Sequence, residues 1–313
     1  MSKATARAWA RRTSAPVKEL VRILTSIAHT RSIHDVFRDF LEVSALAITN
    51  AVDLAQFEPR EKRYFEVIKP YNRTELTQFA EAFANLTLAV WQAQQCVLGG
   101  VMTQLELGNQ WIGQVFSPWE VCHLMARLNF ANSKSEVEAE IAEKGFITVN
   151  DPCCGAGTML LATARALMDL GIDYRKCLHA TGVDIDSRCV HMTYLQLAMM
   201  ELPAHVIEGN TMTLRYTQHW FTRNHILGCW GARTCPEGLQ RALASEDPEI
   251  VAAARMMQRV VAGELDLLKL SDQPGIGPMP SLRADRSAQQ LAVAPPVVWT
   301  PPVTRFVVPR VSI

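Results

Sequence analysis

Two acidic residues and a pair of glycines carry the clearest chemistry in this sequence. Asp151 opens the stretch Asp-Pro-Cys-Cys-Gly-Ala-Gly-Thr, in which Gly155 and Gly157 follow an apolar run. A strand, a glycine-rich turn and the start of a helix bring backbone amides close to a ligand. A second apolar run ends in Gly182-Val-Asp184, which places a carboxylate where ribose hydroxyls could be held. The turn and the second acid together predict a nucleoside-binding half-domain.

The residues of the turn differ from the Gly-x-Gly-x-x-Gly of dinucleotide-binding proteins. Asp-Pro-x-Cys-Gly-x-Gly resembles motif I of the N6-adenine-specific DNA methyltransferases, which use S-adenosylmethionine. Segment 113–118 (Gly-Gln-Val-Phe-Ser-Pro), Asp184 and segment 209–212 (Gly-Asn-Thr-Met) match further signatures of that family in its order. The resemblance covers roughly residues 108–214. It is closest to the modification subunits of type I restriction systems and to short plasmid- and phage-borne N-6 DNA methylases.

The resemblance implies a role in binding S-adenosylmethionine for each matched residue. Asp151 would accept a hydrogen bond from the amino-acid part of the cofactor, and the glycines would let the backbone approach that part and supply amides to it. Cys153 would contribute its backbone, Asp184 would hold the ribose hydroxyls, and Ile185 would cover the adenine. Asn210 would bind the adenine edge, or would be a turn residue with positive φ. The predicted cofactor-binding residues are Phe116, Ser117, Asp151, Cys153, Gly155, Gly157, Asp184, Ile185 and Asn210. A tight turn without a ligand is the alternative.

The tetrapeptide Asn/Asp-Pro-Pro-aromatic, with which the family holds a flipped adenine, does not occur in the sequence. Its polar groups accept hydrogen bonds from the adenine amino group, and its aromatic ring stacks on the base. The Pro-Pro pairs at 295–296 and 301–302 follow Ala294 and Thr300. We therefore predict no catalytic residues, and expect an adenine-specific DNA methyltransferase-like protein that binds S-adenosylmethionine and DNA but lacks the base-binding motif for methyl transfer.

Other functions also fit the sequence. A non-catalytic regulatory or decoy protein of a mobile element, bound to DNA or to restriction-modification subunits, explains the absent tetrapeptide most directly. A small-molecule methyltransferase needs no such tetrapeptide, although segment 113–118 favours DNA. An inert remnant of a longer gene would bind no cofactor.

Composition restricts the class of protein. The net charge is zero, so contacts with DNA would need local basic patches. The first 31 residues are rich in Lys and Arg and contain one acid, Glu19, which is typical of a phosphate-binding arm, a solvated terminus or, less well, a mitochondrial presequence. Scattered cysteines and the lack of a long apolar run predict a reduced cytoplasmic location without a membrane segment. No tight Cys-x2-Cys spacing occurs, and we expect no metal site.

Several helices and strands must position these residues. Apolar periodicity predicts helices over 33–107, and Ser117-Pro-Trp-Glu predicts a capped helix start. Strands over 146–150, 178–184 and 204–208, separated by helices over 157–170 and 187–201, predict a parallel sheet with right-handed crossovers. Residues 225–230 are a candidate fourth strand, which would put 229–232 where the tetrapeptide belongs.

These elements predict an α/β fold, a truncated class I S-adenosylmethionine-dependent methyltransferase (Rossmann-like) domain preceded by a helical domain. The predicted divisions are a basic N-terminal arm (1–32), a helical domain (33–107), a cofactor-binding methyltransferase-like domain (108–235), a helical segment (236–270) and a Pro-rich, largely irregular tail (271–313).

Overall fold

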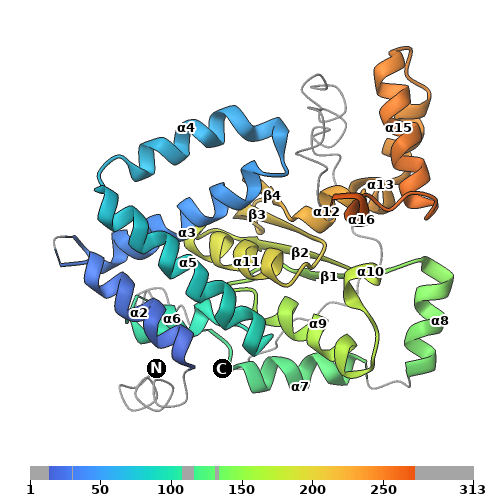
Figure 1. Ribbon diagram of the computed structural model, residues 1–313. Coiled ribbons are helices and arrows are strands. Elements are labelled where there is room, and N and C mark those ends of the chain that lie inside the picture. Colours follow the sequence, from blue (N-terminus) through green and yellow to red (C-terminus); the bar gives the residue numbers. More distant parts are fainter. Residues whose placement is uncertain (1–13, 30, 108–115, 131–133, 272–313) are drawn as a thin grey trace.

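The computed structural model describes residues 14–29, 31–107, 116–130 and 134–271. A layer of helices from the N-terminal part lies beside a four-stranded sheet that carries its own helices (Figure 1). The predicted fold class, a helical region followed by a partial methyltransferase-like α/β region, is confirmed. The N-terminal layer consists of α2 (Ala15–Ile27), α3 (Ile33–Asn50), the 3-10 turn η1 (Leu54–Gln56), α4 (Phe57–Ile68), α5 (Arg73–Ala93) and α6 (Leu98–Gln104).

Within the predicted basic arm (1–32), residues 15–27 form helix α2. Val17, Leu20 and Leu24 recur at helical spacing and are buried, and the helix packs along α5. Lys18 and Arg22 lie on the exposed side of the same helix. Lys18 and Arg22 therefore belong to the solvated face of an amphipathic core helix. Residues 1–13 of the predicted arm lie outside the described residues.

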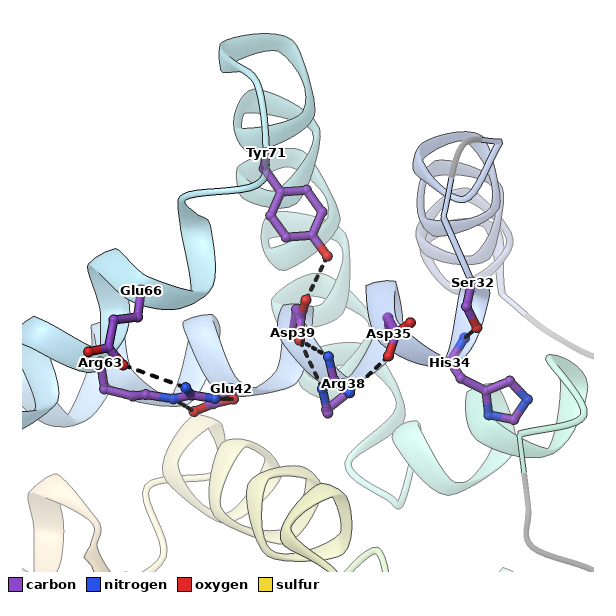
Figure 2. A network of polar contacts seen from close by, with 9 residues as sticks. All are labelled: Ser32, His34, Asp35, Arg38, Asp39, Glu42, Arg63, Glu66 and Tyr71. Atoms are coloured by element: carbon purple, nitrogen blue, oxygen red, sulfur yellow. Dashed lines mark hydrogen bonds and ion pairs between the residues drawn. The ribbon is translucent and has the colours of Figure 1, made fainter.

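Helix α3 is joined to its neighbours by polar contacts as well as by apolar packing (Figure 2). The Tyr71 hydroxyl, just ahead of α5, donates to Asp39 Oδ2 at 2.8 Å. Asp39 also pairs with Arg38, and Arg63 of α4 pairs with Glu42. A buried carboxylate such as Asp39 needs these partners because its desolvation is costly. The network fixes how α4 and α5 sit on α3.

The sheet has the strand order β1-β2-β3-β4. Strands β1 (Ile147–Asp151), β2 (Leu178–Asp184) and β3 (Ala204–Asn210) are parallel, and β4 (Arg215–Phe221) is antiparallel to β3. The three parallel strands correspond to the three that the apolar runs predict. Their carboxyl ends therefore lie along one edge of the sheet.

Helices cover both faces of the sheet. Helices α9 (Thr158–Asp169) and α11 (Ser187–Met199) pack on one face, and α11 also contacts α3 and α5 of the N-terminal layer (Figure 1). Helices α12 (Arg223–Leu227) and α13 (Trp230–Thr234) cover the other face, where His179 of β2 contacts Trp230. Helix α7 (Trp119–Asn129) lies against α9, and short α10 (Tyr174–Cys177) leads into β2.

The prediction of a fourth strand at 225–230 is wrong. That run forms parts of α12 and α13, and the fourth strand is Arg215–Phe221. A short apolar run does not distinguish a buried strand from a buried helix. Apolar residues do not reveal the true fourth strand, because it is a polar edge strand whose first five residues are exposed. The segment that follows the fourth strand is therefore not 229–232.

Three further segments differ from, or complete, the predictions. Helix α7 begins at Trp119 with Pro118 at its N-cap, and no side-chain cap forms there, so the capping box expected from Ser117 and Glu120 is absent. Residues 134–144 form helix α8 (Lys134–Lys144). The region from 236 onward contains α14 (Pro236–Leu243), α15 (Pro248–Val261) and α16 (Leu267–Ser271), and the predicted tail beyond 271 lies outside the described residues.

No single helix among the described residues has both the length and the apolar character to cross a membrane. The sharply bent pair α3 with η1–α4 meets those criteria only when its parts are joined, and α3 is largely buried in the protein core.

Candidate functional site

Each of the three parallel strands ends on a polar side chain. Asp151 is the last residue of β1, Asp184 the last of β2, and Asn210 the last of β3. Because neighbouring parallel strands finish at the same edge, two carboxylates and one amide come together there. This edge is where open α/β sheets bind their ligands, and the rest of the site is built around it.

The glycine turn is held by the two carboxylates. Asp184 Oδ2 accepts from the Gly155 amide at 2.9 Å, and Asp184 Oδ1 accepts from the Asp186 amide at 2.9 Å. Asp151 Oδ1 accepts from the Cys153 amide at 3.2 Å. Gly155 and Gly157 have φ values of 54° and 77°, in the left-handed region that favours glycine. The turn therefore requires glycine at both positions and an acid at the end of β2.

The two glycine amides are used differently from the prediction. They were expected to donate to a ligand, but Gly155 N donates to Asp184 and Gly157 N donates to the Cys154 carbonyl at 2.7 Å. Because this hydrogen bond closes the turn, the Gly157 amide is not available to a ligand. The two glycines therefore contribute by leaving the backbone beside the carboxylates free of side chains.

The segment ahead of α7 reaches the turn, although it is distant in sequence. A β-carbon added at Gly155 would lie 3.3 Å from two ring atoms of Phe116, so that ring lies against the turn. Ser117 follows as an exposed residue. The three preceding residues of the signature, 113–115, lie outside the described residues.

The turn after β3 closes the third side of this edge. Asn210 Oδ1 accepts from the amides of Met212 at 2.9 Å and Thr213 at 3.2 Å, and Thr211 Oγ1 donates to the Pro152 carbonyl at 2.7 Å. Asn210 is thus a turn-forming residue. Its φ is not positive, so the sequence-based alternative of a turn residue with positive φ is wrong about the backbone angle. Nearby Ile185 has 69% of its surface exposed, unusually much for a large apolar side chain that follows a core strand.

Comparison with protein families agrees with this geometry. Residues 104–226 match the model of a family described as N-6 DNA Methylase. The segment is an N-6 DNA methylase domain. No curated protein matches the chain. The methylase domain begins within α6, contains Phe116, the glycine turn, Asp184 and Asn210, and ends in α12.

Burial disfavours the ionised forms of the two strand-end carboxylates, Asp151 and Asp184. Burial, opposed by the Cys153 amide and reinforced by the nearby Asp184 charge, raises the pKa of Asp151 to about 6. Burial also raises the pKa of Asp184, although the backbone amides of Asp186, Gly155 and Ile185 stabilise its charge. Two desolvated acids at one edge favour a ligand with positive charge, because a cation offsets the cost of keeping both ionised.

Two residues that support the turn are not among the predicted site residues. Thr193 and Gln196 of α11 are fully buried, and their side chains donate to the carbonyls of Gly155 and Ala156. Their spacing of three residues places them on one face of the helix. A polar pair in an otherwise apolar stretch of α11 was the available signal.

Among the described residues, no group of three or more His, Cys, Asp or Glu side chains is arranged to hold a metal ion. Four histidines nevertheless form two hydrogen-bonded pairs. His179 Nε2 lies 2.9 Å from His225 Nδ1, and His205 Nε2 lies 2.9 Å from His219 Nδ1. In each pair one neutral ring donates its N–H to the other, and the His179–His225 pair lies beside Trp230 of α13.

Proposed function

We propose that this chain binds S-adenosylmethionine at the carboxyl edge of its methylase domain and binds DNA, without transferring a methyl group to adenine on its own. The observation that carries the cofactor assignment is the Asp184 carboxylate, which ends β2 and holds the Gly155 amide at 2.9 Å. This contact joins the two sequence signatures, the glycine turn and the second acid, into one site.

The residues present fit the chemistry of the cofactor. Its ammonium and sulfonium charges suit the buried acids, with Asp151 toward the amino-acid part. Asp184 has acceptor capacity left for ribose hydroxyls, because each carboxylate oxygen can accept more than the one backbone amide it already binds. Exposed Ile185 would cover one face of the adenine, and Asn210 would offer its Nδ2 donors to the ring edge. When bound, the cofactor supplies an activated methyl group.

The remaining assigned residues would shape the pocket. Phe116, packed against Gly155, would border the methionine end, with Ser117 beside it. Cys153 would act through its backbone, since burial and the two neighbouring acids raise the pKa of its thiol. Gly157 would keep the turn free of side chains where α9 begins. The positive end of that helix suits the cofactor's carboxylate.

DNA is the substrate class that the family implies, and adenine N6 is the position that the resemblance implies. Two features support binding without turnover. The sequence contains no Asn/Asp-Pro-Pro-aromatic tetrapeptide. The fourth strand is antiparallel, so the residues after it are carried to the far edge, where Thr222 bonds the first residue of β3, Ala204. Nothing from that segment reaches the cofactor edge to hold a flipped base.

The second candidate is a complete adenine-specific DNA methyltransferase whose base-binding groups come from another subunit, such as a restriction-modification partner. The family match favours it. The first candidate makes the chain a regulatory or decoy protein, and the second makes it one part of an enzyme.

A transfer assay with the chain alone tests the first candidate. Purified chain is incubated with methyl-tritiated S-adenosylmethionine and adenine-rich duplex DNA, and DNA binding is followed in parallel by fluorescence anisotropy. We expect the chain to bind DNA without incorporating tritium. Incorporation into adenine by the chain alone would contradict the proposal, as would failure to bind either the cofactor or DNA. Asp173→Asn, at the start of α10, is a control carboxylate outside the site.

A further inference from the structure

The glycine turn is braced from behind by one face of α11. Thr193 Oγ1 donates to the Gly155 carbonyl at 2.9 Å, and Gln196 Nε2 donates to the Ala156 carbonyl at 2.8 Å. Both side chains are fully buried. Two consecutive carbonyls of the turn therefore point into the protein, which fixes the orientation of the peptide planes that face the proposed ligand.

Gln196 also reaches into the N-terminal helical layer. Its Oε1 accepts from the Val97 amide at 2.6 Å and from the Leu98 amide at 2.9 Å. These amides begin α6, and Val97 itself provides no side-chain cap. The glutamine thus caps α6 from another part of the chain while its Nε2 holds the turn.

Helix α6 touches the turn directly. A β-carbon added at Gly99 would lie 3.2 Å from the Ala156 β-carbon, and Cys96 Sγ donates to the Ala156 carbonyl at 3.6 Å. With so little space between them, a shift of α6 must shift Ala156 as well. Gln196 fastens both partners of this contact.

We propose that Gln196 is a positioning residue that couples the start of α6 to the shape of the glycine turn, with Thr193 as a second brace. The assignment of the turn to S-adenosylmethionine rests on the proposed function. Because coupling between two sites is reciprocal, cofactor binding then protects the start of α6, and loosening α6 weakens cofactor binding. The helical layer thereby regulates the cofactor site.

The role requires a glutamine. One atom must accept from two amides while the other donates to a carbonyl, and only a side-chain amide offers both at this length without charge. Gln196→Met keeps the volume and loses both functions. Gln196→Glu keeps the acceptor, but its ionised form cannot donate to Ala156 and leaves that carbonyl facing a negative charge.

The experiment combines amide hydrogen exchange with cofactor titration. Exchange of Val97, Leu98 and residues 154–158 is measured by mass spectrometry for the wild-type chain and for Gln196→Met, Gln196→Glu and Thr193→Val, with and without S-adenosylmethionine. Thr163→Val is the matched control, because the buried Thr163 hydroxyl donates only within α9, to the Met159 carbonyl. Circular dichroism verifies that each variant is folded.

We expect Gln196→Met to speed exchange at both segments in the cofactor-free chain and to weaken cofactor binding about tenfold, as for loss of a buried hydrogen-bond partner. Thr193→Val should act mainly on the turn, and Thr163→Val on neither segment. For Gln196→Glu, the ratio of its dissociation constant to the wild-type value should shrink from about pH 8 to about pH 6, because a protonated carboxyl regains the donor. A merely structural role would not produce that pH-dependent rescue.

The outcomes separate this inference from the proposed function. Exchange at Val97, Leu98 and the turn that is unchanged in folded Gln196→Met overturns the coupling, whatever the titration gives. Equal affinity in Gln196→Met and wild type overturns it too. If the wild-type chain binds no S-adenosylmethionine, the proposed function fails, and the cofactor-free exchange data still decide the coupling. Should Gln196→Met fail to fold, Gln196→Glu provides the same exchange and titration tests.

Discussion

At the scale of single residues, the protonation of Asp151 should control cofactor affinity. Its pKa is raised to about 6, mainly by burial. An ionised Asp151 attracts the cofactor's ammonium group, and a protonated one does not, so binding should weaken as the pH falls through about 6. Titrations between about pH 5 and pH 8 check this. Asp151→Asn should bind more weakly at the upper end and should lose most of the pH dependence. A wild-type affinity that is constant over this range would contradict the assignment.

The sequence could predict the residues at this scale because their signatures are local. The Asp-Pro-Cys-Cys-Gly-Ala-Gly stretch, Asp184 and Asn210 all end or follow strands, and the structure brings them to one edge. The bracing by Thr193 and Gln196 could not be predicted, because it depends on which face of α11 meets the turn. The use of the Gly155 and Gly157 amides within the turn likewise follows only from its closed geometry.

At the scale of elements, the glycine turn should tolerate no side chain at Gly157. Its φ is 77°, and an added β-carbon would lie 3.0 Å from Thr193 Oγ1. Gly157→Ala should therefore lower the free energy of unfolding by about 2–4 kcal/mol, from backbone strain plus overpacking. Gly145→Ala is the matched control, since its φ is 81° and nothing lies within 4 Å. It should cost only about 1–2 kcal/mol. Urea denaturation of both variants checks the difference, and equal losses would contradict close packing of the turn on α11.

The helices and strands could be predicted where apolar residues recur with a clear helical or strand period. The three parallel strands and helices α9 and α11 follow apolar patterns that local packing preserves. Helix α2 was hidden by its charges, and β4 by its polar, exposed edge position. The run at 225–230 was misassigned because its burial arises from contact with the sheet face, a property of the assembled fold.

At the scale of the whole molecule, Arg60 should be the main polar link between the helical layer and the sheet. From α4 it pairs with Asp53 at 2.6 Å, donates to the His219 carbonyl of β4 at 2.7 Å and lies 4.9 Å from the Trp220 ring centre. Arg60→Met should cost about 2–4 kcal/mol, because a buried partner charge is left behind. Arg63→Met, with a half-exposed guanidinium paired to Glu42, should cost under about 1 kcal/mol. Denaturation curves for the two variants compare them, and similar costs would contradict a link through Arg60.

Buried histidines on both faces of the sheet should make the folded molecule sensitive to acid. Burial lowers the pKa of His179 and of His191 to about 4, and lowers those of His205 and His225 well below the ordinary value. The unfolded chain binds protons at these positions near pH 6.5 and the folded chain does not, so stability is present above that pH and is lost as the pH falls. Thermal unfolding should show a falling Tm between about pH 7 and pH 5. Burial raises the pKa values of Asp151, Asp184 and Glu208, which act in the opposite direction, but they are outnumbered by the histidines, among which His219 also has a lowered pKa. A Tm that rises over this interval would contradict neutral buried rings.

The most direct test of the account is a calorimetric titration of the chain with S-adenosylmethionine, repeated for Asp184→Ala. The account predicts one cofactor bound per chain, with binding abolished or weakened at least about tenfold in the variant, because both the ribose contact and the brace on Gly155 are removed. Circular dichroism confirms that the variant is folded, and Asp173→Ala serves as the control carboxylate. No binding by the wild-type chain, or equal binding by Asp184→Ala, would contradict the assignment of the carboxyl edge as a cofactor site.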